Sequence, residues 1–345
     1  MTTTDSILIK ALGKQKLSTP PIWYMRQAGR YMPEYRAVRK KFKNFLDMCK
    51  NPDVCCELAL QPLNAFNLDA AILFSDILTI PDALGLEVTF IEKIGPVFNN
   101  PIRSSYDVNQ IKMFDPESLS YVYEAVQNIK RSIPADMPLI GFCGSPWTLV
   151  AYSIEGHSSS NFKKTKTFIE NEKDSTHDLL TRFTDACFLY LREQVKAGAD
   201  VIQIFDSWAN LLSRNDLIEF SMKYITALIN ALKNDPITTN IPIILFSRDP
   251  KIDTKELINS NADCISLYWK MKDFNTEDAR GKVALQGDLN PKILLENKDI
   301  ISLEANKVLE KYKDYPGYIF NLGHGITPDI DPDKIRFLTD IIRNN

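Results

Sequence analysis

Val201-Ile202-Gln203-Ile204-Phe205-Asp206 is an apolar run that ends in an acid, and runs of the same character recur along the chain. A strand that is buried on both faces needs apolar residues at nearly every position. We therefore predict a buried strand at this run and at seven others: Ile22–Gln27, Ala70–Asp76, Leu139–Cys143, Ile243–Ser247, Cys264–Tyr268, Val283–Gln286 and Tyr318–Asn321.

The segments between these runs have helical character. Asn51-Pro52-Asp53 is a helix start signal, with Asn as N-cap and Pro at the first helical position. The segment His177–Lys196 places a stripe of apolar residues on one face, and Gly198 is a suitable end. The stripe consists of Leu180, Phe183, Cys187, Tyr190 and Leu191.

Eight strands that alternate with helices predict an α/β fold, a (β/α)8 TIM barrel in which residues 1–345 form a single domain. The alternative is a doubly wound open sheet. No GxGxxG or Walker motif follows the first run, which counts against that alternative.

The longest connection, residues 77–138, follows the second predicted strand. We expect it to be an insertion over the barrel mouth, with a small hairpin formed by strands near Leu86–Phe90 and Gly95–Phe98. Loops at the C-terminal mouth of a barrel commonly form its active site.

Composition excludes several classes of protein. The chain has 345 residues, 44% of them hydrophobic, and a formal net charge of −3, which disfavours a dedicated nucleic-acid binder. No apolar run is long enough for a membrane helix, and the N-terminus lacks the pattern of a signal peptide. Six scattered cysteines and three histidines show no metal-ligand spacing. We expect a cytoplasmic protein with free thiols and no metal site.

A local cationic segment contrasts with this overall charge. Seven basic residues, beginning with Arg26 and Arg30 and continuing through Arg39 to Lys43, face a single acid, Glu34. Arginines at the end of a strand can grip carboxylates through paired hydrogen bonds. The segment therefore indicates a small polyanionic ligand.

Polar residues follow several of the predicted strands, and a barrel would bring them to one end. They are Arg26, Gln27, Ser75, Asp76, Tyr152, Asp206, Ser207 and His324. Each has a structural alternative: Asp76 and Asp206 can cap helices, and His324 can be a turn residue. We favour the cap for Asp206, and the joint placement favours a site for the others.

Six motifs, in this order along the chain, resemble the uroporphyrinogen decarboxylase family. They are MRQAGRYMPEYR (25–36), LFSDIL (73–78), GFCGSPWTLVAY (141–152), IFDSW (204–208), ALQGDLNP (284–291) and NLGHGITPDIDP (321–332). The resemblance covers Ile22 to Pro332 and implies a barrel, a homodimer and an enzyme of tetrapyrrole biosynthesis. That enzyme would decarboxylate the acetate side chains of uroporphyrinogen III to give coproporphyrinogen III, without a cofactor.

The same resemblance implies the residues of the site. Asp76, Arg26 and Arg39 would be catalytic, with Asp76 accepting the pyrrole N–H groups and the arginines clamping the edge carboxylates. The implied substrate-binding set is Arg26, Gln27, Ala28, Arg30, Arg39, Asp76, Tyr152, Ser207 and His324. We expect His324 to act best when protonated, since its ordinary pKa is near 6.5.

The chain departs from the usual family pattern at several rim positions. The fifth strand usually ends in Lys-Gly, where this chain has Phe246-Ser247-Arg248-Asp249. Asn210, His157, Tyr268 and the Asp288/Asn290 exchange are further departures.

Two other functions compete with this one. A corrinoid-dependent methyltransferase shares the barrel, but it is expected to hold zinc through His and Cys near its C-terminal strands, and no cysteine follows Cys264. A nucleic-acid- or phosphate-binding module using the Arg26–Lys43 segment would leave Asp76 without a purpose.

Overall fold

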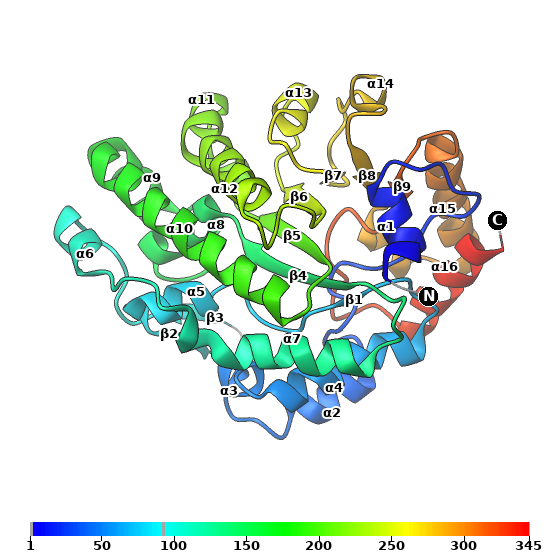
Figure 1. Ribbon diagram of the computed structural model, residues 1–345, viewed down its shortest axis with the longest axis horizontal. Helices are drawn as coiled ribbons and strands as arrows, with labels where there is room; N and C mark the ends of the chain where they lie inside the picture. The colour runs from blue at the N-terminus through cyan, green and yellow to red at the C-terminus, as the bar shows by residue number, and fades with distance from the viewer. Residues whose placement is uncertain (1–2, 92–93, 345) are drawn as a thin grey trace.

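A curled parallel sheet forms the centre of the computed structural model, which describes residues 3–91 and 94–344. Within these residues, seven strands pair in the order β1-β4-β5-β6-β7-β8-β9 (Figure 1). The strands are β1 (Ala71–Ile72), β4 (Leu139–Gly144), β5 (Val201–Asp206), β6 (Ile243–Ser247), β7 (Cys264–Ser266), β8 (Ala284–Gln286) and β9 (Tyr318–Ile319). Seven of the eight predicted runs therefore contain a parallel strand.

The first predicted strand, Ile22–Gln27, is much shorter than expected. Only Ile22 pairs, in a single parallel bridge with Phe320 just after β9. On its other side, the Ile22 carbonyl accepts a hydrogen bond from Asp69 N–H, just before β1, at 2.8 Å. The extended backbone ends early because Arg26 adopts φ of 63°, in the left-handed region. The Ile22 segment nevertheless lies between the two outer strands of the sheet, as in folds that resemble a TIM barrel.

Helices surround the sheet (Figure 1), most of them on its outer face. They are α1 (Ile7–Leu12), α2 (Pro33–Arg39), α3 (Phe45–Cys49), α4 (Pro52–Ala65), α5 (Thr79–Pro81), α6 (Ser105–Gln110), α7 (Ser120–Ser132), α8 (Pro146–Glu155), α9 (Lys163–Asn171), α10 (Lys173–Ala197), α11 (Arg214–Asp216), α12 (Lys223–Asn234), α13 (Thr254–Ile258), α14 (Thr276–Ala279), α15 (Lys298–Tyr312) and α16 (Pro332–Arg343). Shorter helical turns are η1 (Thr3–Asp5), η2 (Asp82–Leu86), η3 (Pro116–Leu119), η4 (Ala209–Leu211), η5 (Leu217–Met222) and η6 (Pro291–Leu295).

The helix signals in the sequence are confirmed. Asn51 caps α4 by accepting a hydrogen bond from Val54 N–H at 3.1 Å, with Pro52 at the first position. Helix α10 begins at Lys173, four residues before the predicted start, and ends at Gly198. Gly198 has φ of 118°, a conformation that glycine adopts without strain. None of the described helices is both long and apolar enough to cross a bilayer.

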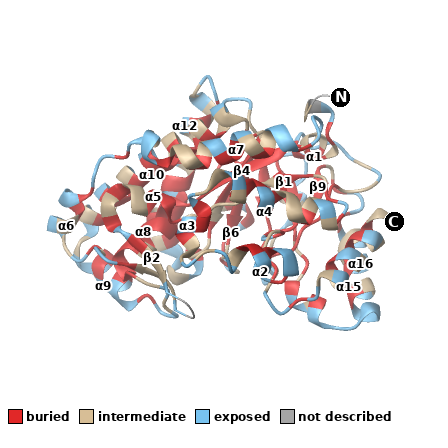
Figure 2. Ribbon diagram, turned by 90° about the horizontal axis from the view of Figure 1, so that it is seen from below, coloured by how far each residue is buried: buried red, intermediate tan, exposed pale blue. Residues whose placement is uncertain are grey.

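The interior of the sheet is organised in layers along its strands. The lowest layer is apolar and packs against α1; it comprises Trp23, Ala70, Ile140, Val201, Ile244, Cys264, Ala284 and Ile319. Above it, Gln286 accepts a hydrogen bond from Trp23 Nε1 and donates one to Ser266 Oγ. Met25, Phe246 and Tyr268 form a separate small cluster above this polar layer. Figure 2 shows the strands buried and the outward helix faces exposed.

A small hairpin lies within residues 77–138, as the sequence predicts. It consists of β2 (Val88–Ile91) and β3 (Gly95–Phe98), which pair antiparallel. Phe98 N–H donates to the Gly156 carbonyl at 2.8 Å, and Val97 forms an antiparallel bridge with His157. The hairpin is therefore attached to the loop after α8, which follows the carboxyl end of β4.

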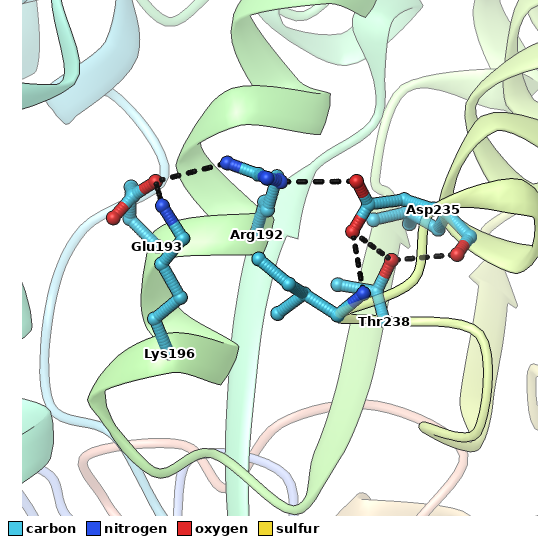
Figure 3. A network of polar contacts seen from close by, with 7 residues as sticks. Arg192, Glu193, Lys196, Asp235 and Thr238 are labelled. Carbon is cyan, nitrogen blue, oxygen red and sulfur yellow. Dashed lines mark hydrogen bonds and ion pairs between the residues drawn. The ribbon is translucent and has the colours of Figure 1, made fainter.

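A polar network on the outside joins α10 to the turn that precedes β6 (Figure 3). Arg192 donates to Asp235 at 3.0 Å and lies 3.6 Å from Glu193, which also pairs with Lys196. Thr238 and its neighbours hold the Asp235 carboxylate in the turn. Because this network lies at the amino ends of the strands, it holds the scaffold and is remote from the strand ends considered next.

Candidate active site

The polar residues predicted at the carboxyl ends of the strands do lie at that edge of the sheet. Parallel strands present their carboxyl ends at one edge, so residues that immediately follow them gather there. Asp76 follows β1, Tyr152 lies on α8 after β4, Ser207 follows β5 and His324 follows β9. Arg26 belongs to the turn that follows the Ile22 bridge.

Asp76 is half-buried, and its pKa is raised from 3.8 to about 6. Loss of hydration is the main cause, and it is opposed by the Leu78 N–H and by the positive charge of Arg26. One carboxylate oxygen, Oδ1, accepts the Leu78 N–H at 2.8 Å and so holds the turn before α5. Within the described residues the other oxygen, Oδ2, accepts no hydrogen bond. Asp76 can therefore hold the turn through Oδ1 and bind a ligand through Oδ2 at the same time.

Arg26 has an exposed side chain with a lowered pKa. Desolvation by surrounding protein is the main cause; Tyr152 and Asp76 oppose it, while Arg30 and Arg248 add to it. An exposed group that is nevertheless desolvated lies against a concave protein surface. In the described part of the chain Arg26 makes no ion pair.

The glycines that flank His324 have a steric reason. A Cβ at Gly325 would collide with the side-chain stem of Arg26, and a Cβ at Gly323 would collide with the backbone of Trp269. The Ile326 N–H also donates to the Met25 carbonyl at 3.0 Å. The Gly-His-Gly loop after β9 is therefore packed directly against the turn that contains Met25 and Arg26, which we call the arginine turn.

Two further arginines lie in the same region, Arg30 in the turn before α2 and Arg39 at the end of α2. The pKa of Tyr35 on α2 is raised to about 12, mainly by burial, and it is also affected by the charges of Arg39, Arg30 and Asp76. The Tyr35 ring lies 5.8 Å from that of Phe74, two residues before Asp76. Arg39 donates one N–H to the Phe42 carbonyl at 2.6 Å. Arg30, Arg39 and Asp76 thus all lie near the same residue, Tyr35.

The Gln27 side chain makes two hydrogen bonds to the backbone. Its Oε1 accepts a hydrogen bond from Tyr24 N–H, and its Nε2 donates to the Ala70 carbonyl at 3.1 Å. The side chain is 1% exposed, so it joins the arginine turn to the start of β1 rather than facing a ligand. Its neighbour Ala28 is half-buried, and its N–H makes no hydrogen bond to any described residue. The Gln27 N–H donates to the Tyr24 carbonyl and its own carbonyl accepts the Tyr31 hydroxyl, which leaves the Ala28 N–H available to a ligand.

An aromatic group borders the site at α8 and β5. The Tyr152 ring lies 5.6 Å from Trp208 and 5.9 Å from Phe162, edge-on to both. Burial raises the pKa of Tyr152, so its hydroxyl stays protonated and can donate a hydrogen bond. Ser207, between Asp206 and Trp208, is half-buried.

His324 lies in surroundings that disfavour its charged form, whereas we expected it to act best when protonated. Desolvation, followed by the charges of Arg26 and Arg248, lowers its pKa to about 4. Its ring packs against Phe246 and Tyr268, each 6.3 Å away between ring centres. His324 therefore offers a neutral imidazole to a ligand.

The helix-cap prediction for Asp206 is wrong. This fully buried carboxylate accepts hydrogen bonds from three hydroxyls: Ser145 at 2.7 Å, Thr148 at 3.2 Å and Ser221 at 2.7 Å. Ser145 and Thr148 belong to the first turn of α8, and Ser221 belongs to η5. Asp206 thereby fixes α8, which carries Tyr152, against the end of β5.

Sequence reasoning missed Arg248 as a member of the site. It was noticed only as a departure at the end of the fifth predicted strand, yet its charge acts on both Arg26 and His324. The available signal was its position, since a residue just after a buried strand lies at the carboxyl edge. In the described residues, no group of three or more His, Cys, Asp or Glu side chains is arranged to hold a metal ion. All six cysteines are buried free thiols.

Comparison with solved structures supports the fold. A methyltransferase from Methanosarcina mazei superposes with a TM-score of 0.79 at 20% identity, covering 100% of this chain and 99% of the other. A B12-independent methionine synthase from Shewanella gives a TM-score of 0.55 at 15% identity, with 96% of each chain covered. At these identities the similarity concerns the fold alone.

Comparison by sequence is more specific. Uroporphyrinogen decarboxylase from Vesicomyosocius okutanii is 44% identical over 335 residues, which are 97% of this chain and 96% of the relative. The enzyme of the same name from Francisella tularensis subsp. novicida is 45% identical over 343 residues, 98% of each. The uroporphyrinogen decarboxylase (URO-D) family profile matches residues 3–345. The chain therefore belongs to the uroporphyrinogen decarboxylase family.

Proposed function

We propose that this chain is a uroporphyrinogen decarboxylase that converts uroporphyrinogen III to coproporphyrinogen III by removing carbon dioxide from each acetate side chain. The observation that carries the proposal is a desolvated carboxylate, Asp76, within electrostatic range of the unpaired Arg26 at the carboxyl edge of the sheet. An acid among arginines suits a ligand that has N–H groups at its centre and carboxylates around its edge.

The central role belongs to Asp76. Its Oδ2 is available to accept pyrrole N–H groups, and an ionised carboxylate can accept several hydrogen bonds at once. Its neighbours Leu73 and Leu78 are buried, so the surroundings are apolar and strengthen the interaction. Protonation of a pyrrole carbon makes a cation conjugated to the acetate methylene. The bond between the methylene and the carboxylate then breaks and carbon dioxide leaves. The methylene takes up a proton to become methyl, and the ring carbon releases the proton that it gained. The negative charge of Asp76 stabilises that cation, and the pyrrole serves as its own electron acceptor.

The arginines hold the periphery. Arg26, Arg30 and Arg39 clamp edge carboxylates and orient the reacting acetate. Because Arg26 has a lowered pKa, it is a stronger acid than a free arginine, and we assign to it the proton that reaches the pyrrole carbon. Tyr152, Ser207 and the neutral His324 supply hydrogen bonds to further acid groups, and the Ala28 N–H supplies another. Gln27 positions the arginine turn.

The architecture completes the proposal. We infer that the Ile22 segment is the eighth strand of a closed (β/α)8 barrel, a single domain over residues 1–345. Residues 77–138 then form an insertion beside the mouth, attached through the Phe98–Gly156 hydrogen bond. We also expect a homodimer in a reducing cytoplasm, which sedimentation of the purified protein and thiol titration in lysate would test.

The decisive experiment incubates purified protein with uroporphyrinogen III under anaerobic, reducing conditions and separates the products by carboxyl number. The wild type should yield products with successively fewer carboxyl groups. Asp76→Asn should keep the fold and lose most activity. Asp314→Asn, which changes an exposed aspartate paired with Lys16, is the matched control and should retain activity. Absence of conversion by the wild type, or full turnover by Asp76→Asn, would contradict the proposal.

A further inference from the structure

Arg248 is held at the carboxyl edge by two contacts. It follows β6 directly, and its N–H donates to the Asp206 carbonyl at 3.0 Å, which fixes its backbone beside the end of β5. Its guanidinium carbon lies 5.4 Å from the centre of the Trp208 ring. Trp208 in turn contacts the edge of Tyr152. The cation–π contact orients the guanidinium plane and leaves its N–H edges available to a planar anion.

The charge of Arg248 is not neutralised within the described residues, where it forms no ion pair. The adjacent carboxylate, Asp249, accepts the Lys251 N–H at 2.8 Å instead. The charge of Arg248 lowers the pKa of Arg26, and the charges of both arginines lower the pKa of His324. Unpaired cations that repel one another are unfavourable in the free protein, and a polyanion that pairs with each of them relieves the repulsion.

Arg248 and the other arginines come from opposite sides of the sheet. β6 is the fourth of the seven strands in spatial order, whereas the Ile22 segment that precedes Arg26 lies between the first and the last. A ligand with acid groups on one side only would engage Arg26, Arg30 and Arg39 and leave Arg248 unused. A ligand with carboxylates around its whole edge would engage both sides.

We propose that Arg248 is a further substrate-binding residue, which grips a carboxylate of the macrocycle on the side opposite to Arg26, Arg30 and Arg39. This inference rests on the proposed function for the identity of the ligand. It assigns a role to a position at which the chain departs from the usual family pattern. It also explains why the guanidinium is stacked on Trp208, since bidentate binding requires a fixed plane.

The test compares Arg248→Gln and Arg248→Lys with the wild type and with Arg182→Gln, an exposed arginine on α10 paired with Asp178. We expect Arg248→Gln to raise KM for uroporphyrinogen III about tenfold, equivalent to about 1.4 kcal/mol, with a smaller change in kcat. The KM of Arg248→Lys should lie between those of the wild type and Arg248→Gln, because lysine keeps the positive charge but lacks the planar guanidinium group. Arg182→Gln should match the wild type. Circular dichroism and thermal melting check that each variant is folded.

A second measurement separates this inference from the proposed function. Binding of uroporphyrin III, the oxidised macrocycle with the same carboxylates, is followed by quenching of tryptophan fluorescence. If the wild type binds it without decarboxylating the reduced form, and Arg248→Gln binds it about tenfold more weakly, the proposed function fails and the inference stands. If turnover and KM are unchanged in Arg248→Gln, the inference fails and the function stands. No binding and no turnover by the wild type would overturn both.

Discussion

Asp76→Asn should make the protein more stable at neutral pH while it removes activity. Burial raises the pKa of Asp76 from 3.8 to about 6, about two units, and each unit corresponds to about 1.36 kcal/mol. Ionised Asp76 therefore lowers the free energy of unfolding by about 3 kcal/mol. Because the pKa of Asp76 is higher in the folded protein than in the unfolded chain, its effect on the free energy of unfolding depends on pH. The full stability is present below about pH 4, where the carboxyl is protonated in both states, and about 3 kcal/mol of it is lost as the pH rises through 6. Asparagine keeps an oxygen for the Leu78 N–H and never ionises.

The measurement is urea unfolding of the wild type and Asp76→Asn between pH 4 and 8. The difference in unfolding free energy should be smallest near pH 4 and should grow in favour of the variant to about 3 kcal/mol above pH 7. Asp314→Asn is the matched control of opposite sign, because its pair with Lys16 lowers the pKa of Asp314. That variant should lose stability as the pH rises. An Asp76→Asn protein that is no more stable than the wild type at pH 8 would refute the desolvation argument.

Three further predictions concern other residues of the site. Arg26→Ala should lower kcat/KM about 10- to 150-fold, because it removes one charge-assisted hydrogen bond of about 1.5–3 kcal/mol. If steady-state kinetics give unchanged kcat and KM, Arg26 does not belong to the site. The C2 proton of His324, identified by its disappearance in His324→Asn, should titrate near pH 4 in the NMR spectrum, and titration near 6.5 would show that the imidazole is not desolvated. Asp206→Ala should lower the unfolding free energy by about 3–5 kcal/mol, because three buried hydroxyls lose their acceptor. Urea unfolding measures this loss, and a smaller value would mean that water replaces the carboxylate.

The strands were the most predictable part of the structure. Val201–Asp206 and Ile243–Ser247 have the predicted bounds because a strand buried on both faces requires a continuous apolar run. The strand predicted at Ile22–Gln27 was too long, for a local reason that the apolar pattern does not reveal. Arg26 adopts a left-handed backbone conformation, which ends the extended segment before its apolar and polar residues are exhausted.

The site was predictable in position more than in chemistry. Asp76 and His324 follow strands, so the edge at which they lie was evident from the chain order. Their charge states depend on neighbours from distant segments: burial, followed by the charges of Arg26 and Arg248, lowers the pKa of His324. The buried hydrogen bonds of Gln27 likewise depend on Ala70, which no local pattern reveals.

The hydrogen bond from Met25 N–H to Asn321 Oδ1 joins residues that are 296 positions apart. A ribosome that adds about 5–20 residues per second needs about 15–60 s to make that stretch. The arginine turn therefore cannot gain its Asn321 partner until the segment that follows β9 has been made. Throughout that interval the cationic segment from Arg26 to Lys43 lacks the contact that holds its backbone in the folded protein.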